Sequence, residues 1–156
     1  MTQAALAKRL KSIIFGVGIF GLIFYQVVIP YLCIELFENT FDKLLLSILF
    51  LCSSGIPCYV VLFIAYRIAD NIGKDLSFTN ENAKLLKWIS TLAMIDSTYL
   101  LIGNIVLIII DAMNVMSFII LFMFVFLGVA ISIVAAALSH LVAKAALLQS
   151  QNDLTI

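Results

Sequence analysis

Four long apolar runs, separated by shorter segments that carry charge, constrain this chain more than any other feature. They cover residues 12–34, 44–66, 88–110 and 115–139. A helix needs about 20 mainly apolar residues to cross the hydrocarbon core of a bilayer, and each run is long enough. None shows the alternating polarity of a transmembrane strand. Because 64% of the residues are hydrophobic, the sequence predicts an all-α membrane protein, a single-domain bundle of four transmembrane helices.

The positive charges predict the orientation of these helices. Lys and Arg together number 9, as do Asp and Glu, so the formal net charge is zero. The Lys and Arg residues lie in the N-terminal segment, in the loop 67–87 and in the tail 140–156, with Lys43 as the one exception. Loops rich in Lys and Arg stay in the cytoplasm. We therefore expect both termini in the cytoplasm (N-in, C-in) and a multi-pass protein of the cell membrane.

The first run follows Lys8, Arg9 and Lys11, as the apolar part of a secretory signal follows its basic segment. It is longer than the apolar part of such a signal, and no small-residue cleavage pattern comes after it. We expect this run to be an uncleaved membrane anchor.

Local signals indicate where the helices begin and end outside the apolar runs. Residues 67–72 are expected to continue the second helix, and Gly73 offers a C-terminal stop. The third helix is expected to start near Thr79, whose hydroxyl suits an N-cap. No breaker occurs before Gln149, which predicts an extended cytoplasmic C-terminal helix. Its leucines need a partner surface, either the 67–87 loop of the same chain or another protein.

Three glycines near the start of the first run, Gly16, Gly18 and Gly21, fit the letters of the dinucleotide-binding fingerprint G-x-G-x-x-G. That motif needs a strand before it and a helix N-terminus after it, whereas these glycines lie inside an apolar run. We interpret them as positions where a neighbouring helix approaches closely.

A second set of small residues recurs at every fourth position of the last run, at Gly128, Ser132 and Ala136, and His140 continues the series. This spacing predicts a groove for another helix, either within the bundle or in a homo-oligomer. His140 has no second histidine with which to bind a metal, so we expect a structural role near the headgroups. Pro57, near the middle of the second run, predicts a kink.

Two polar residues lie inside the third run. Asp96 stands about two turns beyond Trp88, at a depth where a carboxylate is costly unless it is protonated, hydrated or paired. Such residues often mark an ion or proton path, which keeps a small oligomeric transporter or channel open as an alternative function. Neighbouring hydroxyls could instead satisfy Asp96 as part of helix packing. Asn104 follows on the same helix.

The sequence offers no set of residues typical of an enzyme. We find no Ser-His-Asp set, no paired catalytic carboxylates and no phosphate-binding loop that one membrane face could assemble. Cys33, Cys52 and Cys58 lack the spacing of a zinc site and are expected to be small buried apolar side chains. We therefore expect a protein without catalytic activity, cofactor or metal.

The middle loop and the C-terminus resemble those of the small bacterial four-span family DUF2975. The signature of that family, G-K-P-F-T-x-E-N before a basic helix start, is similar to Gly73-Lys74, Phe78-Thr79-Asn80-Glu81-Asn82 and Lys84-Leu85-Leu86-Lys87. The ending Asn152-Asp153-Leu154-Thr155-Ile156 also resembles the usual C-terminus. The chain departs from the pattern where Asp75-Leu76-Ser77 replaces a proline, Lys84 and Lys87 replace arginines, and Gln151 replaces a glutamate.

The resemblance implies a regulatory function, because members are frequently encoded beside a very small Cro-like helix-turn-helix regulator. We expect a non-enzymatic bacterial membrane protein that binds and restrains such a transcription regulator at its cytoplasmic face, without contacting nucleic acid directly. The expected docking residues are Phe78, Thr79, Glu81, Asn82, Lys84, Lys87, Asp153, Leu154, Thr155 and Ile156. A transporter or channel that uses Asp96 and an envelope-stress or immunity protein remain alternatives.

Overall fold

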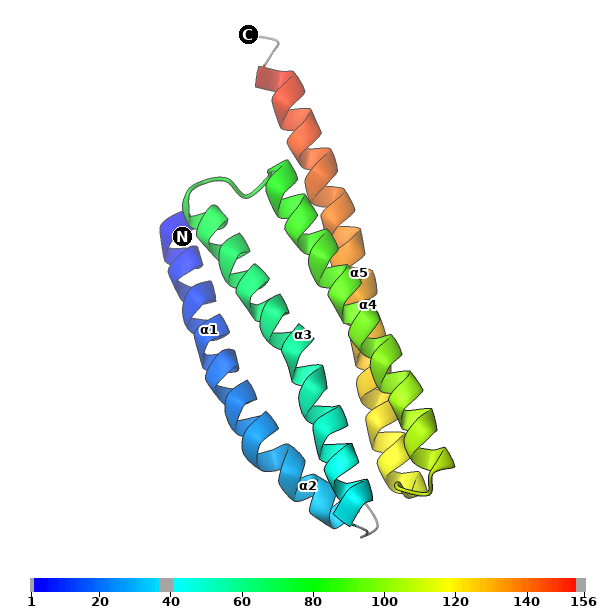
Figure 1. The fold of residues 1–156 in the computed structure, drawn as a ribbon. Coiled ribbons are helices and arrows are strands. Elements are labelled where there is room, and N and C mark those ends of the chain that lie inside the picture. Colours follow the sequence, from blue (N-terminus) through cyan, green and yellow to red (C-terminus); the bar gives the residue numbers. More distant parts are fainter. Residues whose placement is uncertain (1, 37–40, 154–156) are drawn as a thin grey trace.

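The computed structural model describes residues 2–36 and 41–153, which contain helices and no strand (Figure 1). The first helical segment consists of α1 (Gln3–Ile23), a short π-helix η1 (Phe24–Val28) and α2 (Ile29–Leu36). It is followed by α3 (Phe41–Gly73), α4 (Asn80–Ile109) and α5 (Val115–Asp153).

Each of the four segments is long and apolar enough to cross a membrane. Three of the predicted spans lie wholly inside a helical segment, and the span 88–110 exceeds α4 by one residue because that helix ends at Ile109. Many large hydrophobic side chains point outward, and Phe15 and Phe126 are 69% and 68% exposed. A surface of this kind suits lipid rather than water. The predicted set of four long apolar helices is confirmed, and it indicates a membrane protein.

The π-helix in the first segment is explained by a proline. Pro30 has no N–H, and its ring clashes with the carbonyl four residues earlier in an α-helix, that of Gln26. Gln26 lies inside η1, where the wider turn relieves the clash. By contrast, α3 runs as one helix through Pro57, and the kink expected there stays a prediction.

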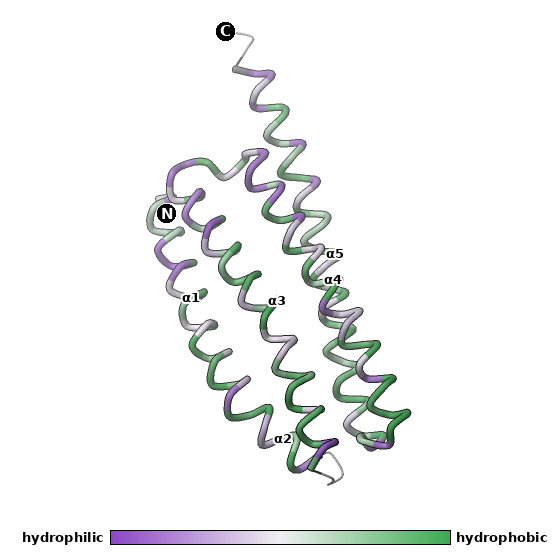
Figure 2. The backbone as a smooth tube through the Cα atoms, viewed as in Figure 1, coloured by the Kyte–Doolittle hydropathy of each residue, from purple (hydrophilic) through white to green (hydrophobic). Residues whose placement is uncertain are grey.

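The helices form two antiparallel hairpins (Figure 1). α1 packs against α3, α4 packs along α5, and α3 contacts α4 between the hairpins. The start of α1, the end of α5 and the α3–α4 loop lie at one end, and α5 extends beyond the other helices there (Figure 1). Hydrophilic residues gather chiefly at this end (Figure 2). We call it the polar end; it comprises the described residues 2–11, 67–87 and 140–153.

A cluster of buried apolar side chains lies toward the opposite end. Its members come from α2, α3, α4 and the α4–α5 turn: Ile29, Cys33, Leu51, Leu107, Ala112 and Met113. Among the cysteines, Cys33 is buried as expected and Cys52 is half-buried. The expectation of burial is wrong for Cys58, which is exposed because it lies at the edge between the two hairpins.

Candidate functional site

The α3–α4 loop turns sharply where α3 ends. Gly73 is the last residue of α3, which agrees with the expected stop. The residue in the left-handed conformation, however, is Asp75, with φ of 60°. Asp is one of the few residues besides glycine that tolerate this conformation. The turn brings the Leu76 N–H to the carbonyl of Asn71 at 3.0 Å, so the loop folds back over the end of α3.

Asn82 holds this loop from the first turn of α4. Its Nδ2 donates to the carbonyls of Leu76 at 2.9 Å and Ser77 at 3.1 Å. Its Oδ1 accepts from Asn71 Nδ2 at 2.7 Å. Thr79, half-buried, caps α4 by accepting the Asn82 N–H at 3.3 Å, which confirms the expected helix start. Asn82 is 2% exposed, so its side chain presents almost no surface to a partner.

The other expected docking residues of the loop are exposed at the polar end. Phe78 has 58% of its surface exposed. Exposed with it on the first turns of α4 are Glu81, Lys84 and Lys87. Glu81 forms an ion pair with Arg67 at 3.1 Å, and both side chains remain largely accessible. An exposed pair of this kind contributes little to stability, which leaves both charges available for contacts with a partner.

The expected docking residues at the C-terminus fall mostly outside the described part of the chain. α5 extends through Asp153, which confirms the predicted long C-terminal helix. The side chain of Asp153 and the residues Leu154, Thr155 and Ile156 lie outside the described structure.

Asp70, near the end of α3 and beyond its apolar span, links α3 to α1. Its carboxylate accepts hydrogen bonds from Lys11 of α1 and, at 2.7 Å, from Lys74. These hydrogen bonds, above all the one from Lys11, lower the pKa of Asp70 to about 2. Lys11 and Asp70 are 59 positions apart, so no local sequence pattern could have revealed the pair.

The part of α5 that we call projecting follows a hydrogen bond to the start of α4. The Ser139 hydroxyl donates to the carbonyl of Ala83 at 2.6 Å. Beyond this point Leu141, Leu147 and Leu148 are 60%, 57% and 59% exposed. The described residues of the loop 67–87, one of the two partner surfaces considered for these leucines, leave most of their surface uncovered.

Small residues form the seam between α4 and α5. On α4 they recur every seven residues: Ala83, Ser90, Ser97 and Asn104. On α5 the matching positions are Gly128, Ser132, Ala135 and Ser139. The Ser132 hydroxyl, for example, donates to the carbonyl of Ser90 at 2.8 Å. The four α5 positions follow one another in steps of four, three and four residues, 11 in all. Because 11 residues complete three helical turns to within roughly 20°, all four side chains lie on the same side of α5.

This seam corrects the predicted stripe of every fourth residue. Gly128 and Ser132 lie in the seam, but Ala136 and His140 are exposed. Each four-residue step rotates the side chain by about 40°, so that His140 lies roughly 120° around the helix from Gly128. Within the bundle, the prediction of one groove through all four positions is therefore wrong.

The glycines of α1 differ in their surroundings. A Cβ atom at Gly21 would lie 3.0 Å from the hydroxyl of Tyr59 on α3. The same hydroxyl donates to the carbonyl of Gly18 at 3.1 Å. No described atom comes within 4 Å of a Cβ placed at Gly16 or Gly18. Close approach of a neighbouring helix is thus seen at Gly21 and at neither of the other two positions.

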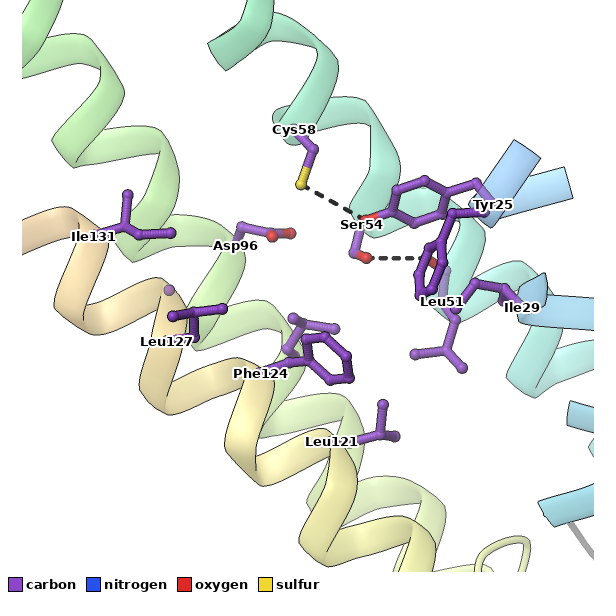
Figure 3. A pocket seen from close by; sticks show the side chains of 13 residues that line it. Tyr25, Ile29, Leu51, Ser54, Cys58, Asp96, Leu121, Phe124, Leu127 and Ile131 are labelled. Atoms are coloured by element: carbon purple, nitrogen blue, oxygen red, sulfur yellow. Dashed lines mark hydrogen bonds between the residues drawn. The ribbon is translucent and has the colours of Figure 1, made fainter. Parts of the chain in front are cut away.

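A cavity of about 190 Å³ lies between the two hairpins (Figure 3). Its lining is mostly apolar, with four polar side chains: Tyr25, Ser54, Cys58 and Asp96. Asp96 points from α4 toward α3 (Figure 3). The Tyr25 hydroxyl donates to Cys58 Sγ at 3.6 Å, and the Ser54 hydroxyl donates to the carbonyl of Leu51 at 2.9 Å. Oδ1 of Asp96 is buried without a hydrogen-bond partner among the described residues.

Asn104 is the second polar residue of this kind. It is fully buried, and neither its Nδ2 nor its Oδ1 has a partner among the described residues. Its place in the seven-residue series puts it on the seam with α5. A buried amide in such a seam can specify the register of two helices at a cost in stability. Packing therefore explains Asn104 better than it explains Asp96, which faces a cavity.

Comparison with known proteins identifies the family. The family model described as "Protein of unknown function (DUF2975)" matches residues 2–156. The chain belongs to the DUF2975 family. The match confirms the resemblance found at the loop and the C-terminus. No curated protein and no solved structure matches this DUF2975 chain, so its function must be argued from its own residues.

In this DUF2975 protein the signature segment contains the end of α3 and the start of α4. A Cβ at Gly73 would lie 2.9 Å from that of Ala7 on α1, so a larger residue would separate the two helices. Thr79 caps α4, and Asn82 binds the loop carbonyls. The departure from the family pattern also has a structural consequence. A proline has φ near −65° and could not take the conformation of Asp75. The backbone of this loop therefore differs from that of a loop with proline at this position.

Proposed function

We propose that this protein is a non-enzymatic regulator, inserted in the bacterial cell membrane, whose polar end binds and restrains a small helix-turn-helix transcription regulator. The observation that carries the proposal is the projecting part of α5, residues 141–152, whose leucines stay exposed beyond the apolar bundle. The basic residues of the polar end favour the cytoplasmic side for it, and in that orientation these leucines would project beyond the lipid.

The shape of this surface suits a small helical partner. Leu141 and Leu148 are seven residues apart and so lie on the same side of α5. A helix of the partner could pack along this ridge with ordinary helix–helix geometry. Phe78 in the neighbouring loop adds an exposed aromatic side chain at the same end of the bundle. Apolar anchors at this seven-residue spacing are typical of helix-in-groove recognition.

The charges at the polar end favour binding away from the DNA-reading face of the partner. Lys84 and Lys87 are exposed there, and a DNA-reading helix carries positive charge of its own. Repulsion between the two would direct contacts to another face of the regulator. Restraint would then come from holding the regulator at the membrane, with no contact between the membrane protein and DNA.

Co-purification tests this function. The protein is solubilised in mild detergent together with the helix-turn-helix regulator encoded by a neighbouring gene, and the dissociation constant is measured. Combining Phe78→Ala with Leu148→Ala should weaken binding at least about tenfold. The matched control combines Phe63→Ala with Leu49→Ala, which removes side chains at least as exposed from the apolar part of α3. Absence of association for the unaltered protein, or equal binding by both double variants, would refute the proposal.

A further inference from the structure

The cavity between the hairpins combines an apolar lining with one carboxylate. Rings of Phe24, Tyr25 and Phe124 contribute to its wall, and Asp96 is the acidic residue of the lining. A second hollow of about 450 Å³ adjoins it and shares Phe24, Tyr25, Cys58 and Phe124 with it. The second hollow is bordered by the outward-facing Phe20 of α1. In the membrane orientation proposed above, it connects the cavity with the lipid.

The carboxylate in this cavity has little compensation from the described residues. Asp96 is half-buried, and its Oδ1 has no hydrogen-bond partner among them. Tyr25 and Ser54 use their hydroxyl protons elsewhere, on Cys58 Sγ and on the Leu51 carbonyl. The Lys and Arg residues of the chain lie outside the predicted apolar spans, toward the two ends of the bundle. A carboxylate held partly out of water is costly when its desolvation is not offset by an opposite charge or by hydrogen bonds.

The donor set favours an organic cation over a metal ion. Hard ions such as Ca²⁺ and Mg²⁺ need six or so oxygen ligands, and zinc needs several closely placed His, Cys or acidic side chains. Among the described residues no three His, Cys, Asp or Glu side chains come close enough to hold a metal. Aromatic rings beside one carboxylate are instead the surroundings in which proteins bind ammonium groups.

We propose that the cavity between the hairpins is a binding site for a small monovalent organic cation, an ammonium group with an apolar body, with Asp96 as its counter-ion. The ammonium group pairs with the carboxylate of Asp96, and the apolar body lies against Phe24, Tyr25 and Phe124. The ligand enters from the lipid through the adjoining hollow. This site is separate from the polar end, so its failure would leave the docking proposal intact.

Equilibrium binding with the full chain in phosphatidylcholine nanodiscs tests the site. The probes are tritiated benzyltrimethylammonium and its uncharged carbon isostere, neopentylbenzene. We expect saturable binding of the cation that the isostere displaces poorly. Asp96→Asn keeps the shape of the side chain but removes its charge, and should weaken cation binding at least about tenfold while leaving the isostere unaffected. Asp96→Glu should restore cation binding.

Two further variants separate charge from volume. Ser54→Val fills part of the cavity and should weaken binding of both probes. Asp111→Asn is the matched control: it removes a carboxylate at the far end of α4, and asparagine tolerates the left-handed conformation found there, with φ of 55°. It should bind the cation as the unaltered protein does. Equal cation binding by the unaltered protein and Asp96→Asn, equal uptake by empty nanodiscs, or full displacement by the isostere overturns the proposal.

Discussion

The close contact between α4 and α5 gives a quantitative prediction at Gly128. A Cβ atom added there would lie 2.2 Å from Ser97 Oγ, 3.5 Å from Ser97 Cβ and 3.8 Å from the Ala93 carbonyl oxygen. Ser97 is 2% exposed, and its hydroxyl donates to that carbonyl at 2.7 Å. The hydroxyl therefore occupies the space that Gly128→Ala would fill.

The expected cost of Gly128→Ala has two opposing parts. Overpacking a buried contact costs about 1–3 kcal/mol. Alanine favours the helix over glycine by about 1 kcal/mol, which offsets part of that cost. We therefore expect a net destabilisation of up to about 2 kcal/mol.

A double-mutant cycle with Ser97→Ala isolates the clash. Without Oγ, the nearest described atom to the new methyl group is the Cβ of residue 97 at 3.5 Å, an ordinary van der Waals contact. In that background Gly128→Ala should be neutral or should stabilise by up to about 1 kcal/mol. The coupling energy between the two positions should then be about 1–3 kcal/mol.

Reversible unfolding in mixed micelles, with sodium dodecyl sulfate as the denaturant, measures these free energies. Gly16→Ala is the matched control, because no described atom lies within 4 Å of its added methyl group, and it should not destabilise the protein. A loss of stability from Gly128→Ala that is the same with and without Ser97→Ala would refute the steric explanation.

Three further predictions concern the polar end. Asn82→Ala should destabilise the protein by about 1–3 kcal/mol, because it leaves buried loop carbonyls unpaired. Hydrogen exchange of the loop amides should become faster. An unchanged exchange rate, or the same effect from Asn80→Ala at an exposed position, would contradict the assigned role of Asn82. Thr79→Ala should cost about 1 kcal/mol in the same unfolding assay through loss of the N-cap, and Thr79→Ser should cost little; equal losses would exclude capping. Asp70→Asn should reduce stability at pH 7, and its difference from the unaltered protein should shrink as the pH falls from about 4 toward 2. The sign follows from the lowered pKa of Asp70, since the stabilisation is present above the unfolded-state pKa and is lost when the folded carboxylate takes up a proton. A difference that stays constant between pH 4 and pH 2 would argue against it.

Local sequence signals were sufficient to predict the helices and most of their ends. The four apolar runs, the end of α3 at Gly73, the cap at Thr79 and the continuation of α5 to Gln149 all depend on residues close together in the chain. Hydropathy, capping and the absence of breakers act over one or a few helical turns. Such features can therefore be inferred without knowing which helices are neighbours.

The tertiary structure decided how those helices use their side chains. In the structure Ala136 and His140 point away from α4, and Lys11 pairs with Asp70. Asn82, expected to contact a partner protein, has its side chain buried under the loop instead. Each of these outcomes depends on the rotation and pairing of whole helices, and a change of about 100° per residue moves a side chain between lipid, seam and cavity. The sequence by itself determined that four apolar helices form, whereas only their packing decided that Asp96 faces a cavity.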